Sequence, residues 1–225
     1  MTAAQHATAF AKACERIGHC QLALENRVEA VKAFTEARDY LAVQPDAETR
    51  VKAVRLNLNL SDVSAAQEKW DDALRFLDAY LENRPIDPDP YEKKVKLLRK
   101  LDRERDVIPA LARYAARMPD VLAIQLLYAR ELSRDPAQRR KAETLYLGLI
   151  ERFSSPEIYR GLFKVYQAED RMIDVLEMFD KVFATIDPKN DIGADVRERT
   201  RERGRAMLQV LNSEPELVKS LLPVV

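Results

Sequence analysis

The side chains best suited to bind a metal lie close together near the start of the sequence. His6, Cys14, His19 and Cys20 offer the nitrogen and sulfur donors that zinc prefers, but a structural zinc needs four ligands that converge on one point. On a single helix Cys14 and Cys20 point to opposite sides and lie roughly 9 Å apart along the axis, since each residue adds about 1.5 Å. The sequence therefore predicts no metal site, and this separation is too large for a disulfide.

Catalytic motifs are also missing from the sequence. It contains no glycine-rich phosphate loop, no Gly-x-Ser-x-Gly and no His-Glu-x-x-His. Adjacent carboxylates such as Asp71 and Asp72 are typical of a helix N-terminus, where the helix dipole favours negative charge. Both histidines lie in the first expected helix, which argues against histidine acid–base chemistry. We expect no catalytic residues, no enzyme activity and no cofactor.

The densest charged run, "VRERTRERGR" from Val196 to Arg205, could contact a nucleic acid. Its arginines and glutamates alternate on a helix, which favours a solvent-exposed helix with internal ion pairs. The whole chain has 37 basic and 37 acidic residues, whereas binding to nucleic acid or an acidic membrane needs a basic excess. An RNA-binding helical array is therefore a less favoured alternative.

Local patterns indicate an all-α chain. Nearly every segment carries apolar residues at i, i+3, i+4 and i+7, glycine is scarce, and prolines lie mostly between the periodic segments. Asp89, Asp135, Ser155 and Ser213 each precede a proline that can begin a helix, and we expect them to act as N-caps. The pattern predicts helices near 3–25, 28–43, 47–67, 69–84, 90–102, 106–118, 120–134, 136–153, 156–169, 171–186, 191–212 and 214–222.

The expected compartment follows from the first residues and the cysteines. The start lacks the basic residues and continuous apolar run of a signal peptide. The most apolar stretch, Val121 to Ala129, is much shorter than the roughly 20 residues of a membrane span. Two thiols without a disulfide suit a reducing compartment. We expect a cytoplasmic protein with no membrane insertion.

A set of small, large and proline residues recurs along the chain. Its copies begin at intervals of 33 to 35 residues, with one longer interval of 43. A period near 34 with two helices in each unit is typical of a helical repeat, in which stacked hairpins share a continuous core. The copies are Ala30, Phe34, Ala37 and Pro45; Ala73, Leu77, Tyr80 and Pro85; Val107, Leu111, Tyr114 and Pro119; Ala142, Tyr146 and Leu149; and Val175, Phe179, Val182 and Pro188.

These positions resemble the second helix of the tetratricopeptide repeat (TPR) family, and Ile17 and Gly18 resemble part of its first helix. The resemblance covers roughly residues 11 to 188. It implies an α-solenoid of antiparallel helix hairpins wound into a right-handed superhelix, with first helices lining a concave face. We expect about five hairpins in residues 1–189, and a capping helix and the start of a further helix in residues 190–225.

The resemblance also implies where a partner would bind. The family's groove positions fall here on Arg55, Asn59, Asp62, Lys93, Lys96, Lys100, Tyr128, Glu131, Arg160 and Lys164. Lys93, Lys96 and Lys100 share one helical face. They favour an acidic or amphipathic protein segment, with Tyr128 as an aromatic anchor of the kind enriched at binding hot spots. The alternative is a lysine-rich helix that simply faces solvent.

Chaperone-tail recognition, known in this family, fits poorly because Glu15 and Asp89 reverse the required charge. The expected function is thus a non-catalytic scaffold that binds a protein or peptide. A helical regulatory segment of a larger enzyme is the main alternative. Near the last residues Leu217, Val218, Leu221 and Leu222 need cover, which self-association, a partner or folding back could supply.

Overall fold

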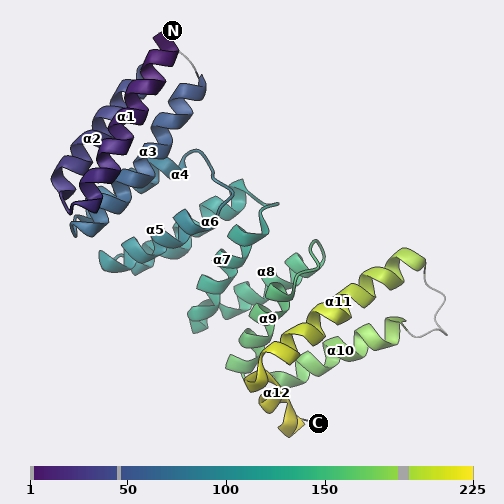
Figure 1. The fold of residues 1–225 in the computed structure, drawn as a ribbon. Coiled ribbons are helices and arrows are strands. Elements are labelled where there is room, and N and C mark those ends of the chain that lie inside the picture. The colour runs from purple at the N-terminus through teal and green to yellow at the C-terminus, as the bar shows by residue number, and fades with distance from the viewer. Residues whose placement is uncertain (1–2, 45–46, 187–192, 225) are drawn as a thin grey trace. The chain divides into compact units, whose positions relative to one another are not determined.

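The structure, a computed structural model, describes residues 3–44, 47–186 and 193–224, and this part of the chain contains helices and turns but no strand (Figure 1). The α-helices are α1 (Ala3–Ala23), α2 (Arg27–Ala42), α3 (Ala47–Ala66), α4 (Trp70–Leu81), α5 (Asp89–Lys100), α6 (Val107–Arg117), α7 (Leu122–Arg134), α8 (Arg139–Ile150), α9 (Pro156–Ala168), α10 (Met172–Ile186), α11 (Ala194–Ser213) and α12 (Pro215–Leu221). Short 3-10 turns cover Glu104–Asp106, Pro136–Gln138 and Leu222–Val224. The predicted all-α fold is confirmed, and the predicted helix ends lie within three residues of those observed.

Two of the four predicted N-caps are wrong. Asp89 is already inside α5, because Pro88 takes the N-cap position; the Asp89 N–H donates instead to the carboxylate of Asp87, at 3.1 Å. Ser213 is the last residue of α11, and its hydroxyl donates to the carbonyl of Val210 at 3.0 Å. In both cases the helix boundary lies one residue away from the position that the proline suggests.

The other two predicted residues, Asp135 and Ser155, do occupy N-cap positions. Asp135 precedes the turn before α8, and its carboxylate accepts a hydrogen bond from the Ala137 N–H at 3.0 Å. Ser155 is the N-cap residue of α9, but its hydroxyl contacts the carboxylate of Glu157 rather than a backbone N–H. This contact lowers the pKa of Glu157.

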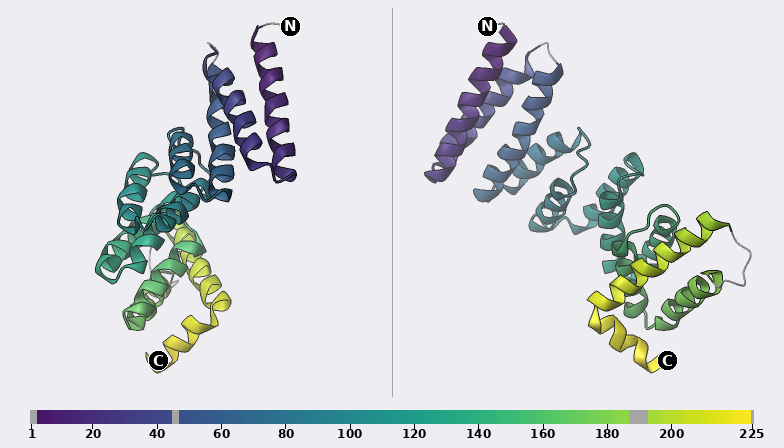
Figure 2. Two further views of the ribbon diagram at one scale, coloured as in Figure 1. Left: turned by 90° about the vertical axis from the view of Figure 1, so that its left-hand side faces the viewer. Right: turned by 45° about the vertical axis from the view of Figure 1, so that its right-hand side comes forward.

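The chain divides into two compact units, residues 1–114 and 115–225, and each is described by itself. In unit 1, α1, α2, α3 and α4 pack in sequence order, each against the next (Figures 1 and 2). In unit 2, α7, α8 and α9 do the same, while α11 packs on both α9 and α10. The predicted division near residue 189 concerns repeats rather than compact units, and it stays a prediction, as does the handedness of the superhelix.

The recurring positions form the core, as predicted. Phe34, Leu77, Leu111, Tyr146 and Phe179 are all buried. The small residues Ala30, Ala73 and Ala142 are fully buried where helices approach closely. Pro45 and Pro188 lie outside the described residues.

Two glycines make room for two of these aromatic rings. A Cβ on Gly18 of α1 would lie 2.6 Å from the Phe34 ring, and a Cβ on Gly161 of α9 would lie 2.4 Å from the Tyr146 ring. Such distances are far inside van der Waals contact. Any larger residue would therefore push the ring out of its place, and close packing makes that costly.

A recurring turn joins the two helices of most hairpins. Two residues after a first helix ends, the chain places an acidic residue at a positive φ of 55 to 60°, a conformation uncommon outside glycine. The next residue donates its N–H back across the helix end, as Arg171 does to the Tyr166 carbonyl at 2.8 Å. These acidic residues are Glu25, Glu68, Asp102 and Asp170.

The same turns explain the irregular repeat period. Their spacings are 43, 34 and 68 residues, the last being two periods of 34. The first three helices have 16 to 21 residues, whereas α4 to α9 have 11 to 13. The longer first helices therefore account for the interval of 43.

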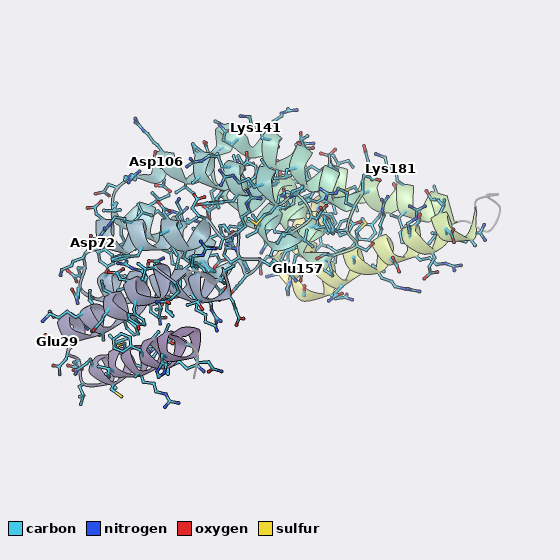
Figure 3. All side chains as sticks on the ribbon, turned by 90° about the horizontal axis from the view of Figure 1, so that it is seen from above. Glu29, Asp72, Asp106, Lys141, Glu157 and Lys181 are labelled. Atoms are coloured by element: carbon cyan, nitrogen blue, oxygen red, sulfur yellow. The ribbon has the colours of Figure 1, made fainter. Side chains whose placement is uncertain are left out.

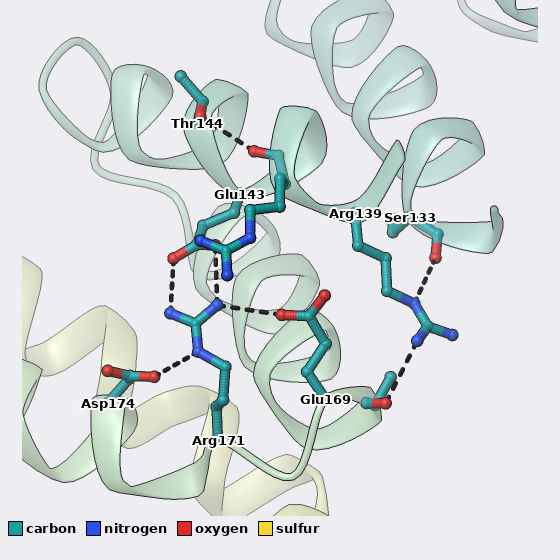
Figure 4. Close-up of polar contacts among 9 residues, drawn as sticks. Ser133, Arg139, Glu143, Thr144, Glu169, Arg171 and Asp174 are labelled. Carbon is teal, nitrogen blue, oxygen red and sulfur yellow. Dashed lines mark hydrogen bonds and ion pairs between the residues drawn. The ribbon is translucent and has the colours of Figure 1, made fainter. Parts of the chain in front are cut away.

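Arginines tie neighbouring hairpins together in both units. Arg27, the first residue of α2, donates to the Ala66 carbonyl at the end of α3, at 2.6 Å. Arg139, the first residue of α8, donates to the Ala168 carbonyl at the end of α9, at 3.3 Å (Figure 4). A cation at the C-terminal end of a helix also interacts favourably with the helix dipole.

The strongest polar joint of unit 2 surrounds Arg171 (Figure 4). Its guanidinium makes two hydrogen bonds of 2.9 Å to Glu143 of α8. It also contacts Glu169 at 3.0 Å and Asp174 at 2.8 Å. The hydrogen bond to Arg171, opposed by burial, lowers the pKa of Glu143 below its ordinary value of 4.5. This arrangement links α8 to the α9–α10 turn.

Candidate functional site

The predicted groove residues of unit 1 lie on α3 and α5. Arg55 and Asp62 are exposed on α3, and Asn59 is half-buried between them. The Lys93 amine of α5 lies 2.6 Å from the Asp62 carboxylate. The structure thus brings the two first helices together at this point, and Asp62 partly neutralises Lys93.

Lys96 and Lys100 of α5 are exposed. The Lys100 amine lies 5.8 Å from the centre of the Trp70 ring, within the range of a cation–π contact. Trp70 is half-buried at the start of α4. Together with Arg55 of α3, these two lysines supply exposed positive charge among the predicted groove residues of unit 1.

A third kind of lysine on α5 was missed by the sequence interpretation. Lys94 is buried, with its amine 2.6 Å from the Asp78 carboxylate and 3.0 Å from the Tyr114 hydroxyl. Burial alone would lower the pKa of Lys94, but the hydrogen bonds to Asp78 and Tyr114 raise it overall. Lys94 therefore has a structural role. The sequence feature that could have indicated its burial is the set of apolar residues next to it in α5.

Unit 2 contains a cavity of about 620 Å³ between α7 and α8. Its apolar lining includes Tyr128, the predicted aromatic anchor, which is half-buried. Basic side chains stand at its edge, and Figure 3 shows Lys141 reaching outward from the helices. The lining residues are Gln125, Tyr128, Leu132, Arg140, Lys141, Thr144, Leu145, Gly148, Leu149 and Arg152.

The walls of this cavity are held in place by polar contacts. Gln125 is buried, and its amide donates to the carbonyls of Ala115 and Met118 at 2.8 and 3.1 Å, which satisfies the end of α6. Arg152 pairs with Asp120 at 2.6 Å. Arg140, Lys141 and Arg152 are all exposed, and the ion pair with Asp120 partly neutralises Arg152, so Arg140 and Lys141 are the better candidates to meet an acidic ligand.

Glu131, another predicted groove residue, lies beneath the surface. It is 5% exposed, and its carboxylate is 3.4 Å from the Arg134 guanidinium. It sits one turn after Tyr128 on α7. Its position suits support of the helix surface better than direct contact with a ligand.

The predicted groove residues of α9 form ion pairs within the chain itself, although Lys164 remains exposed. Glu214, the residue before α12, places its carboxylate 3.0 Å from Arg160 and 3.3 Å from Lys164. Leu217 and Leu221 of α12 are buried, so folding back supplies their cover. Val218 and Leu222 remain 38% and 69% exposed. The predicted self-association through this end stays a prediction.

The other candidate residues lie apart from these surfaces. Cys14 is buried, while Cys20, His6 and His19 are exposed. Among the described residues, no group of three or more His, Cys, Asp or Glu side chains is placed to hold a metal. Likewise, no described helix is long and apolar enough to cross a bilayer.

The arginine-rich run forms part of α11, as predicted. Glu198 pairs with Arg201 at 3.5 Å and with Arg205 at 3.3 Å, both on the exposed surface. Arg203 turns inward and contacts Glu151 of the α8 end at 3.0 Å. Much of this positive charge is therefore paired within the protein, in line with the predicted solvent-exposed helix with internal ion pairs.

Comparison with known proteins gives matches in structure alone. No family model matches the sequence, and no curated protein matches it. A TPR repeats protein (BF2334) from Bacteroides fragilis NCTC 9343 is 13% identical over 95% of this chain and 97% of its own, with a TM-score of 0.49. YrrB, described as a TPR protein with an unusual peptide-binding site, is 17% identical over 82% of this chain and 95% of its own, with a TM-score of 0.46. By its helix pairs and repeat period, this chain is an all-α helical-repeat protein that resembles the TPR family.

Proposed function

We propose that the chain is a non-catalytic scaffold that binds a protein segment carrying large apolar and acidic side chains, and that the α7–α8 cavity is its binding site. The observation that carries this proposal is the combination of lining residues. Tyr128, Leu132 and Leu145 offer an apolar surface, while Arg140 and Lys141 offer positive charge at its edge. Ligand sites commonly combine a mostly apolar concave surface with a few polar groups that orient the ligand.

Gly148 supports this assignment. It lies in the last turn of α8, two residues before Ile150, and glycine inside a helix is less favourable than alanine by roughly 0.5–1 kcal/mol. Within the described residues, a Cβ at this position would meet no neighbouring side chain or other helix within 4 Å. Packing inside unit 2 therefore does not explain the glycine, whereas close approach of a ligand backbone would.

The predicted groove includes a second basic surface, Lys96 and Lys100 of unit 1. Both are exposed, and Lys100 lies over Trp70. We propose that they attract an acidic segment of a protein partner, separately from the α7–α8 cavity of unit 2. Their contribution should act mainly on the association rate and fall with added salt, because exposed charges are screened.

The test selects short peptides from a random library on the full chain and measures their affinity by fluorescence anisotropy. We expect selected peptides to combine acidic with large apolar residues. Gly148→Phe, which fills the cavity mouth, and Arg140→Glu with Lys141→Glu should each weaken binding about tenfold or more. Lys96→Glu with Lys100→Glu should weaken the binding of those selected peptides that use the unit 1 surface, and more so at low salt.

Lys181→Glu is the matched control, since Lys181 of α10 is exposed and outside the cavity (Figure 3). It should leave affinity unchanged. All variants should keep the melting temperature of the parent or raise it slightly at Gly148. Peptides that bind the Gly148→Phe chain as well as the parent would show that the cavity is not the site.

A further inference from the structure

Helix α12 is short and makes a narrow contact with the rest of unit 2. It has seven residues, and it packs against α9, α10 and α11. Short helices are marginal on their own and depend on their packing. Only Leu217 and Leu221, one turn apart, bury their side chains, while Val218 and Leu222 stay exposed. The buried contact is therefore a narrow apolar stripe.

The polar contacts of α12 are directed at one neighbour, α9. Glu214 occupies the N-cap position, but its carboxylate contacts Arg160 and Lys164 rather than the first N–H groups of α12. Further along, the Gln167 amide donates to the Ser220 hydroxyl at 2.8 Å and to the Glu216 carbonyl at 3.4 Å. All three α9 residues are three or four positions apart and share one face.

These contacts describe a recognition pattern. An acidic residue meets two cations, and a leucine pair three and seven residues later fills the apolar stripe. Helices that bind grooves present anchors at this spacing. An unrelated helix with the same pattern could make the same contacts, and it would have to displace α12 to do so.

We propose that the surface beneath α12, formed by Arg160, Lys164 and Gln167 of α9 together with the adjoining parts of α10 and α11, is a second interaction surface, for an amphipathic partner helix with an acidic residue ahead of a Leu-x-x-x-Leu pair. Helix α12 occupies this surface until such a partner displaces it. Because α12 is tethered, it competes at a high effective concentration, so the partner must bind tightly or be tethered itself. This inference does not depend on the α7–α8 cavity.

Hydrogen exchange on the full chain tests whether α12 can leave. The amides of α12 should exchange at least about tenfold faster than those of α9 and α11, since a displaceable helix opens without global unfolding. Equal protection of α12 and α11 would overturn the proposal, because α12 would then be an integral part of unit 2.

A labelled peptide with the sequence of residues 212–224 tests the surface itself. It should bind the full chain carrying Leu217→Asp and Leu221→Asp, which releases α12, about tenfold more tightly than it binds the parent. Adding Arg160→Glu and Lys164→Glu should abolish this gain, while adding Lys181→Glu should not. The proposal is wrong if the peptide fails to bind the released chain, if binding survives the α9 reversals, or if release costs helical content beyond α12.

Discussion

The hairpins α7–α8 and α9–α10 belong to the same unit but are closed by different turns. After α9, Asp170 takes a positive φ of 56°, and the next residue, Arg171, bonds back to Tyr166. After α7, Asp135 is extended and a 3-10 turn precedes α8. Three other described hairpins use the first kind of turn, so α7–α8 is the exception among these five.

The two turns differ in what lies beside them: the turn after α9 carries the ion pairs of Arg171, whereas the turn after α7 joins the two helices that line the cavity. The regular turn presents Arg171 to Glu143, Glu169 and Asp174, which fixes α9–α10 against α8 (Figure 4). The irregular hairpin is the one whose two helices line the 620 Å³ cavity. The proposed ligand cavity thus coincides with the irregular turn, but a second cavity of about 610 Å³ lies beside the regular turns after α1 and α3, so an irregular turn is not required for a cavity.

The largest expected effect comes from breaking the joint. Arg171→Met leaves three carboxylates close together without their cation, and it should lower the free energy of unfolding by about 2 kcal/mol. The estimate stays below that for a fully buried pair because the Arg171 side chain is 31% exposed. Urea denaturation followed by circular dichroism measures this change.

Arg171→Lys is the matched control for charge. It keeps the cation but loses the two parallel hydrogen bonds to Glu143, so it should cost about half as much. If Lys and Met variants are equally destabilised, the fork geometry matters more than the charge. If neither is destabilised, the joint contributes little to the stability of the hairpin.

A smaller effect should appear in the pH dependence of the same joint. The folded-state pKa of Glu143 lies below its ordinary value of 4.5 because of Arg171. Its stabilisation is therefore complete above pH 4.5 and is lost as the pH falls through the folded-state pKa. Glu143→Gln should cost about 1 kcal/mol at neutral pH and less in acid. A difference between the two chains that does not shrink on acidification would contradict this assignment.

The smallest effects come from the turns and should have opposite signs. Asp170→Gly relieves an unfavourable positive φ and should stabilise the protein by up to about 1 kcal/mol. Asp135→Ala removes a helix cap and should destabilise it by about 1 kcal/mol. Thermal melting of both variants under one condition tests this pair. Two shifts of the same sign would mean that the two turns do not differ in the way described.

Part of the candidate site was predictable from the sequence and part was not. Tyr128 was identified because first-helix positions follow the repeat, and it lines the cavity. Arg140 and Lys141 were missed because they lie at the start of a second helix, where the repeat pattern indicates only packing residues. Their proposed role in ligand binding depends on the irregular α7–α8 turn, and no single residue type in the sequence indicates such a turn.

The sequence by itself determined the twelve α-helices of the described residues, their order and the buried recurring positions, because periodicity and proline placement act over a few residues. Tertiary structure alone decided which charged side chains pair between helices. Glu214 meets Lys164 across 50 positions of the chain, and Lys93 meets Asp62 across 31. No local pattern encodes such distances, since they follow from how whole helices stack. The sequence therefore specified the repeat, and the packing of the helices determined which charged side chains form ion pairs within the protein.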